Sequence, residues 1–530
     1  MTSFRPALLL AILAAVPAAA QTPERRTPPS PAEVPALVVF ITVDQLRPDY
    51  FDRWRGQLTG GLARLAGGGA FFTDAYHDHA HTETAPGHAS TLSGRFPRGT
   101  GIVRNSAGVQ DPQAPLIDAA GPGASPFRFR GSTLFDWLRG RDPRSRALSV
   151  SRKDRGAILP IGRDPQDVYW FADAGTVTTS TWYRDTLPEW VQRFNARRLP
   201  HGHAGRAWTL LLPDSAYPEP DSVAIESGGR DFVFPHVMPD DSATAARQLG
   251  NFPWMDEVTI AFALDGMREM RLGAGPQTDL MAISLSATDF IGHRFGPDSR
   301  ELHDQILRLD RMLAVFLDSV FAMRDSAKVV IALTSDHGVA PYPEVREARG
   351  RGRAVKVDLA PLVMRLEKSL ASRGVDSTMW TLEGAVLLLD SGALARKGVR
   401  ADSVARAFAS DARRVPGVMR ADLVSSLARR DTVRDAIARR WYHALPPDFP
   451  AAVVVTLEPY AVPVWAPVAM HGSPHDYDAH VPVIFYGRQF KPGRYDRFAR
   501  VVDMAPTLAW VTAVTPTERL DGRVLWEALR

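Results

Sequence analysis

The sequence contains no cysteine among its 530 residues. Disulfide bonds, thiolate metal ligands and cysteine nucleophiles are therefore excluded, and any metal ion must be held by histidines and carboxylates. Charge of either sign is also nearly balanced, because 63 Lys and Arg residues stand against 59 Asp and Glu residues, a formal net charge of +4. So small an excess does not favour nucleic acid as a partner. The 14 histidines become the residues to follow.

Long apolar segments are absent as well. The strongly apolar run ALLLAILAAV that follows Arg5 is too short to span a membrane. Together with the PAAA after it, this run has the layout of a secretory signal peptide, so we expect residues 1–20 to be removed on export to the periplasm or the medium. The Pro-rich residues 21–35 predict a disordered lead-in, and no later segment resembles a transmembrane anchor.

Three apolar, β-branched runs each end in an acidic residue. LVVFITV over residues 37–43 ends in Asp44, DLMAISLSATD reaches Asp289, and KVVIALTSDHG reaches Asp336 and His337. Continuous apolar runs are typical of strands buried on both faces of a parallel sheet, whose ligand sites lie beyond the carboxyl ends of the strands. An unpaired carboxylate at a buried strand end is costly. The pattern therefore predicts one polar site at this edge.

The order of elements predicts the fold class. Apolar residues recur at helical spacing over residues 299–324, between the second and third runs, which predicts an amphipathic helix and a right-handed crossover. We therefore expect an α/β fold with a central, mostly parallel sheet layered by helices. The chain contains no internal repeats or heptads, and its oligomeric state is left open.

Two segments do not follow this regular pattern. Residues 106–250 are rich in Pro, Gly, Asp and Trp and show little periodicity. Residues 345–465 contain helical patterns at 359–373 and 401–412 and strand-like runs in TLEGAVLLLD and AAVVVTLEP. We expect the first segment to be an insertion or cap and the second to be an inserted α+β segment, both within one catalytic domain over residues 36–530. The chain then returns to the core with HVPVIFYG and the helical VVDMAPTLAWV.

Thr84 stands at the front of a predicted helix, with Pro86 in its first turn. A hydroxyl at this position faces the unpaired N–H groups of a helix N-terminus, which favour an anion. An ordinary N-cap is the alternative interpretation, since Ser and Thr are preferred caps.

Histidines and carboxylates recur at metal-ligand spacing. Asp289 and His293 are four residues apart in DFIGH and can reach one ion from a single helical turn, although a capping Asp and a surface His would give the same pattern. Asp336, His337 and Gly338 form a tighter group at another strand end. With Asp44 and Thr84, these residues supply enough ligands for two zinc ions with open positions.

These residues also carry a family resemblance. VDQLRPDYF, TETAPGH, SRKDRGAILP, DFIGHRFGP, TSDHG and HGSPHDYDAHVPVIFYG together resemble the alkaline phosphatase superfamily, and within it the Thr-nucleophile alkaline phosphatases of the PafA type, over residues 36–515. The resemblance implies an exported zinc-dependent enzyme that hydrolyses small phosphate monoesters through a covalent phosphothreonine at Thr84.

The resemblance also implies two zinc sites. One ion would be bound by Asp44, Asp336 and His337 beside the Thr84 oxygen. The other would be bound by Asp289, His293 and a histidine near the C-terminal end. His471 is the favoured third ligand, with His475 and His480 as the alternatives.

Three further residues concern the substrate. The resemblance implies that Asn105 donates its amide to a non-bridging phosphate oxygen, and that Lys153 and Arg155 lie over the outer oxygens. A pair of cations gains more from a dianionic monoester than from a diester. Without the resemblance, Lys153 and Arg155 would be interpreted as part of a solvated loop.

Other functions remain as alternatives. Phosphodiesterases and nucleotide pyrophosphatases share the zinc ions, the Thr and the Asn but lack the Lys-x-Arg pair. A sulfatase is disfavoured, because its nucleophile derives from Cys or Ser in a C/S-x-P-x-R context. A non-catalytic zinc- or phosphate-binding module is the third possibility, against which the presence of Thr84 beside the ligands counts.

Two other sets of residues have open roles. His77, His79 and His81 alternate and could share one face of a strand to bind a metal, although a polar rim beside the site is the simpler interpretation. The basic run over residues 346–353, REARGRGR, could contact a polyanion, but such runs are more often mobile, solvated loops.

Overall fold

A nine-stranded sheet forms the centre of the molecule, in the order β18-β2-β17-β10-β1-β9-β4-β5-β6. The structure, a computed structural model, describes residues 29–466 and 469–530, so the predicted signal peptide and the first part of the lead-in lie outside the described residues. In sheet order the strands span Gly493–Tyr495, Ala70–Phe72, Val483–Tyr486, Val329–Thr334, Leu37–Val43, Asp279–Leu285, Ala147–Ser151, Asp167–Phe171 and Val177–Thr178.

β1 lies in the middle of this sheet and pairs in parallel with both β9 and β10. All of its residues are buried. Because successive side chains of a strand point to opposite faces, Val39 enters one hydrophobic core while Val38 and Phe40 enter the other. The predicted buried parallel strands, and the α/β class with a mostly parallel sheet, are confirmed.

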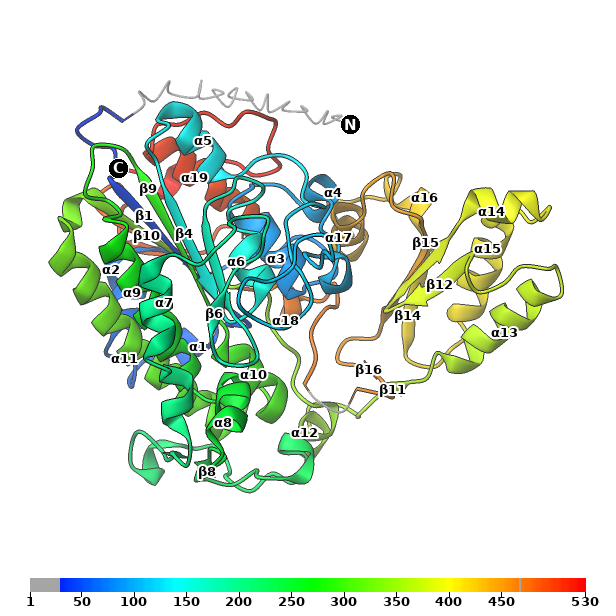
Figure 1. Ribbon diagram of the computed structural model, residues 1–530. Helices are drawn as coiled ribbons and strands as arrows, with labels where there is room; N and C mark the ends of the chain where they lie inside the picture. Colours follow the sequence, from blue (N-terminus) through cyan, green and yellow to red (C-terminus); the bar gives the residue numbers. More distant parts are fainter. Residues whose placement is uncertain (1–28, 467–468) are drawn as a thin grey trace, which may run out of the picture.

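Helices cover both faces of the sheet (Figure 1). One layer contains α2 (Gly61–Gly68), α9 (Trp254–Glu269) and α11 (Arg300–Met323). The other contains α3 (Thr84–Thr91), α5 (Leu134–Arg141), α6 (Asp154–Ile158) and α19 (Met504–Val511). α11 is the predicted amphipathic helix, and it connects β9 to β10 across β1. Within residues 29–466 and 469–530, no helix combines the length and the apolar character needed to cross a membrane.

The segment 106–250 differs from the prediction of an insertion. β4, β5 and β6 fall within it and extend the central sheet, with β4 parallel to β9. The prediction was wrong for these strands because they are short and because β4 alternates Ser with apolar residues, ALSVS, instead of forming a continuous apolar run. The later part of the segment is irregular. Its larger elements are α7 (Glu189–Ala196), the short pair β7 (Ala207–Trp208) and β8 (His236–Val237), and α8 (Ser242–Gln248).

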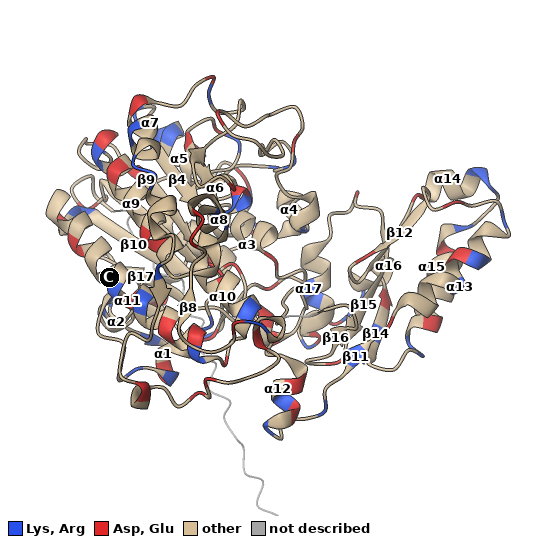
Figure 2. Cartoon of the chain, turned by 60° about the horizontal axis from the view of Figure 1, so that its bottom comes forward, with Lys and Arg blue, Asp and Glu red and all other residues tan. Residues whose placement is uncertain are grey.

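Residues 356–463, here called the second lobe, extend to one side of the molecule (Figure 1). The lobe contains a four-stranded sheet in the order β12 (Trp380–Glu383), β13 (Val386–Leu389), β15 (Ala451–Leu457) and β14 (Val418–Leu423). One face is covered by α13 (Ala360–Ala371), α14 (Ser391–Arg396) and α15 (Ala401–Ala412), and the other by α16 (Val424–Leu427) and α17 (Ala436–Ala444). Acidic and basic residues are mixed along the helices of its outer surface (Figure 2).

One strand prediction in this lobe was wrong. TLEGAVLLLD was expected as a single strand, but it forms the antiparallel hairpin of β12 and β13. Gly384 has a φ of +59°, a conformation that glycine adopts at little cost, and it turns the chain between the two strands.

Candidate functional site

Thr84 is the first residue of α3 and is almost completely buried. Glu83 occupies the N-cap position with an extended backbone. The Thr84 hydroxyl accepts a hydrogen bond from Lys153 Nζ at 3.4 Å. The interpretation of Thr84 as an ordinary N-cap is therefore wrong, and its hydroxyl lies at the helix N-terminus, beside a cation.

Asn105 is fixed beside Thr84 by its backbone and by its side chain. The backbone N–H of Asn105 donates to Glu83 Oε2 at 2.7 Å, and the backbone N–H of Ala85 donates to Asn105 Oδ1 at 2.8 Å. Because Oδ1 already accepts a hydrogen bond, the amide group that remains for a ligand is the Nδ2 donor. A phosphate oxygen accepts hydrogen bonds, so Nδ2 is the group of Asn105 that could bind it.

The first candidate metal group lies at the ends of two adjacent parallel strands. Asp44 follows β1, and Asp336 and His337 follow β10. His337 Nε2 lies 3.4 Å from Asp44 Oδ1 and 3.7 Å from Asp336 Oδ2. All three atoms are buried, and none has a hydrogen-bond partner among the described residues. Two carboxylates and one imidazole that are buried, converge, and each keep one atom without a hydrogen bond fit a divalent ion such as zinc.

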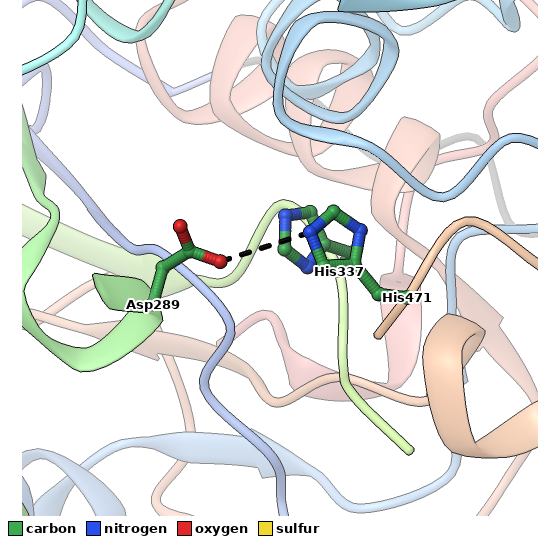
Figure 3. Close-up of side chains that lie close together, drawn as sticks. All are labelled: Asp289, His337 and His471. Atoms are coloured by element: carbon green, nitrogen blue, oxygen red, sulfur yellow. Dashed lines mark ion pairs between the residues drawn. The ribbon is translucent and has the colours of Figure 1, made fainter. Parts of the chain in front are cut away.

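The second candidate group joins α10 (Ala287–Phe295) to a segment that follows the second lobe. Asp289 lies in the first turn of α10, and His293 Nε2 is 3.2 Å from its Oδ1. His471 Nε2 lies 3.1 Å from His293 Nε2 and 3.7 Å from Asp289 Oδ1. The His471 ring also stacks on His337, with ring centroids 3.6 Å apart, and His337 lies close to Asp289 and His471 (Figure 3). His337 therefore offers a ligand atom near both groups.

The other histidines named from the sequence lie elsewhere. His475 Nε2 bonds to the carbonyl of Leu457 at 2.9 Å, and His480 Nε2 to that of Thr73 at 2.8 Å. This geometry favours His471 as the third ligand. The three alternating histidines are His77, His79 and His81. Each is buried and bonds to a backbone carbonyl, so they do not form the exposed polar rim that was expected beside the site.

Lys153 links the two candidate metal groups. Its Nζ donates to Asp44 Oδ2 at 2.5 Å and to Asp289 Oδ2 at 2.6 Å. Burial tends to lower the pKa of Lys153, but the charges of Asp289 and Asp44 outweigh burial and raise it, so the ammonium is charged. The sequence predicted two cations over the phosphate. The structure adds that Lys153, one of the two, forms ion pairs with Asp44 and Asp289, because a buried ammonium binds the nearest carboxylates.

The remaining pKa shifts follow from burial and charge. Burial raises the pKa of Asp44 well above its ordinary value, and neighbouring carboxylates add to the rise. Burial also tends to raise the pKa of Asp289, but Lys153, His293 and His337 together outweigh burial and hold that pKa well below its ordinary value. Burial lowers the pKa of both His337 and His471, which keeps their imidazoles neutral, the form that binds metals.

A cavity of about 620 Å³ opens above these groups. Its volume is typical of sites for small organic ligands. The lining includes most of the predicted residues, namely Thr84, Asn105, Lys153, Arg155, Asp289, His293 and His471. The rest of the wall is formed by Ser227, Gly228, Asn251, Phe290 and Arg294. Arg155 is half-buried and its Nε has no hydrogen-bond partner in the described part of the chain, so its charge faces this site without a strong partner.

Besides the unpredicted residues of the cavity wall, two residues that contact the predicted site residues, Glu83 and His88, were missed from the sequence. Glu83 holds Asn105, as described above. His88 lies on α3, one turn after Thr84, with Nδ1 3.2 Å from Asp336 Oδ2 and Nε2 bonded to Ser284 Oγ at 2.9 Å. The i,i+4 spacing of Thr84 and His88 was the signal that could have identified it.

Comparisons with known proteins show the family and the fold of the chain. The profile of the family described as type I phosphodiesterase / nucleotide pyrophosphatase matches residues 38–351. The alkaline phosphatase PhoV of Synechococcus elongatus is 29% identical over 98% of this chain and 98% of its own length. The alkaline phosphatase PafA of Elizabethkingia meningoseptica is 26% identical over 93% of this chain and 94% of its own length. A crystal structure of alkaline phosphatase PafA has the same fold, with a TM-score of 0.86 at 24% identity, covering 94% of this chain and 99% of the solved chain.

Proposed function

The chain belongs to the type I phosphodiesterase / nucleotide pyrophosphatase family, and on that premise we propose that it is a zinc-dependent phosphomonoesterase that acts through a covalent phosphothreonine at Thr84. Its similarity over nearly the whole chain to proteins named alkaline phosphatase supports phosphate monoesters as substrates. The signal-like residues 1–20 support export.

One observation carries the proposal. The ammonium of Lys153 contacts the Thr84 hydroxyl and also the carboxylates of both candidate metal groups. The hydroxyl and both groups therefore lie around a single side-chain nitrogen, which is the compact arrangement that transfer of one phosphoryl group needs.

The candidate ligands divide into two sets. Asp44, Asp336 and His337 would hold one zinc ion. Asp289, His293 and His471 would hold the other. When bound, the two ions supply Lewis-acid stabilisation of oxygen anions at both ends of the transferring group.

The remaining steps belong to side chains of this chain. Thr84 Oγ1 releases its proton to solvent and forms a bond to phosphorus while the bond from phosphorus to the ester oxygen breaks, and the alcohol leaves with a proton taken from solvent. Water then attacks the phosphothreonine, which releases inorganic phosphate and restores the hydroxyl. Asn105 Nδ2, Lys153 and Arg155 donate to the non-bridging oxygens throughout, which holds the phosphoryl group in line with Thr84.

The family profile keeps one alternative open, a phosphodiesterase or nucleotide pyrophosphatase. Lys153 and Arg155 favour the monoesterase. Two cations that line the same cavity attract a dianionic phosphate monoester more strongly than a monoanionic diester. A non-catalytic zinc-binding module is the other alternative, and it leaves the position of Thr84 beside both groups without a role.

The test compares kcat/KM for an aryl phosphate with that for the matching aryl methyl phosphate, on protein stripped of metal and on the same protein reloaded with zinc. We expect the zinc-loaded protein to prefer the monoester by a factor of about 100, the contribution of one or two charge-assisted hydrogen bonds. A preference for the diester would establish the phosphodiesterase alternative. Zinc binding without turnover of either ester would establish the binding module.

A further inference from the structure

The loop that carries Asn105 is held from two sides, and one of them belongs to the second lobe. From within the central domain, Glu83 Oε2 accepts the Asn105 N–H at 2.7 Å. From the second lobe, the carboxylate of Glu383 binds both neighbours of Asn105. Arg104 Nη2 lies 2.5 Å from Glu383 Oε2, and Ser106 Oγ donates to Glu383 Oε1 at 2.7 Å.

The backbone of Glu383 is fixed within the lobe. Glu383 is the last residue of β12 and pairs with Val386 across the hairpin that Gly384 closes. Val386 is fully buried and packs in the same cluster as Trp441 of α17. The carboxylate therefore projects from a hairpin that is anchored in the core of the lobe, so it can restrain the Asn105 loop.

The lobe has other attachments near the site. The backbone N–H of Ala80 donates to the carbonyl of Arg440 in α17 at 2.9 Å. Arg439 Nε, also in α17, lies 2.9 Å from the carboxylate of Asp78. Arg98 Nη1 donates to the carbonyl of Leu445 at 2.7 Å. Because these contacts do not involve the hairpin, loss of the Glu383 carboxylate leaves the lobe docked.

Arg104 depends on this carboxylate. Its side chain is only 12% exposed, and its Nε and Nη1 are buried without a hydrogen-bond partner among the described residues. A mostly buried guanidinium that loses its partner carboxylate is strongly destabilised in place and moves toward solvent. Such a movement would shift Asn105, the next residue along the chain.

We propose that Glu383 is a positioning residue through which the second lobe fixes Asn105 against the phosphoryl group. The proposal rests on the phosphomonoesterase function proposed above. Glu383 does not line the cavity, so it acts through Asn105 and not by contact with substrate.

The test is a double-mutant cycle on the full, zinc-loaded protein, with an aryl phosphate as substrate. We expect Glu383→Ala to lower kcat/KM by about 10-fold and Asn105→Ala by about 100-fold or more. In the Asn105→Ala background, Glu383→Ala should change kcat/KM by less than about twofold, because the group it positions is gone. Glu367→Ala, which alters an exposed glutamate on α13 of the same lobe, is the matched control and should match the wild type.

Two results would overturn the proposal: no effect of Glu383→Ala in the wild-type background, or the same factor in both backgrounds. A second variant, Glu383→Gln, goes through the same cycle, and melting curves are measured for all variants. Glutamine keeps an acceptor for Ser106 but loses the charge opposite Arg104. The second variant ensures that a folding defect in Glu383→Ala does not decide the outcome. We expect the glutamine variant to lose less activity than the alanine variant and to show the same dependence on Asn105. If the wild-type protein itself fails to hydrolyse the monoester, the proposed function fails, and that result is distinct from either one above.

Discussion

The two regions that meet at the cavity are built in opposite ways. At the ends of the central strands, the ligand candidates come from neighbours in a parallel sheet, and the Asp44 side chain is fully buried. On the side of the second lobe, the Asn105 loop depends on Glu383, whose side chain is 40% exposed and belongs to an inserted hairpin. The difference indicates that Asp44 and Asp336 are held at the ends of neighbouring sheet strands, whereas the Asn105 loop is held in part by a segment outside the central sheet.

The largest expected effect lies on the sheet side of this comparison. Thr84→Ala should lower kcat/KM for an aryl phosphate by about four orders of magnitude, because no hydroxyl remains to form the phosphothreonine. Thr84→Ser should retain part of the activity. Since Thr84 is not the N-cap, the free energy of unfolding of Thr84→Ala should not show the decrease of about 1 kcal/mol that loss of a cap produces. Its melting temperature should therefore stay close to that of the wild type. An active alanine variant that melts early would reverse both expectations.

Metal removal tests the same side. Dialysis against a chelator should abolish activity, and zinc should restore it, because the ligand candidates are imidazoles and carboxylates only. Asp336→Asn should lower the zinc content measured by mass spectrometry and reduce kcat/KM by about two to three orders of magnitude. Full turnover by protein shown to be metal-free would contradict the assignment.

A third prediction concerns the cations that separate monoesters from diesters. Because Lys153 also binds Asp44 and Asp289, its removal disturbs both candidate metal groups, and Arg155→Ala is the cleaner variant. We expect kcat/KM for the aryl phosphate to fall by about 10- to 100-fold, the loss of one charge-assisted hydrogen bond. The aryl methyl phosphate should lose much less. Equal losses on both esters would assign Arg155 to general anion attraction.

The smallest expected effect concerns the support of α10. Burial raises the pKa of Asp256 to about 7. Its carboxylate accepts from the Ala287 N–H at 3.0 Å and from Gln305 Nε2 at 3.0 Å. As pH rises from about 4 to about 7, the unfolded chain releases a proton that the folded chain still holds, so this group lowers stability across that window.

Asp256→Asn removes this dependence, because an amide does not ionise. Its Oδ1 can still accept from Ala287. Once the Gln305 amide turns over, the Nδ2 can donate to Gln305 Oε1, which is buried without a partner among the described residues. The melting temperature of the variant relative to the wild type should therefore increase between pH 5 and pH 8. An equal difference at the two pH values would show that Asp256 is ionised in the folded protein throughout.

The sheet side of the site could be predicted from the sequence, because Asp44, Asp289 and Asp336 each follow a continuous apolar run at or within one turn of the strand end. His471 carried no such signal, and only the family resemblance singled it out from its neighbours. The short strand β4 was missed because it lacks an apolar run. The pairing of Lys153 was missed because sequence does not show which carboxylates surround a buried ammonium.

The second lobe shows where such reasoning stops. Two of its helices, α13 and α15, and the strand β15 follow from sequence pattern and agree closely with the expected ranges. The contact of Glu383 with Ser106 joins residues 277 positions apart, and nothing in either segment indicates it. Contacts of this kind depend on how an inserted lobe docks, which local sequence pattern does not specify.

The central claim is that Thr84 is the nucleophile between two metal groups. Its most direct test is a rapid acid quench of the zinc-loaded protein during turnover of a phosphate monoester, followed by peptide mass spectrometry to locate covalent phosphate. We predict phosphate on Thr84 in the wild type and none on the corresponding peptide of Thr84→Ala. Phosphate on another residue, or active turnover by the alanine variant with no phosphopeptide at all, would contradict the claim.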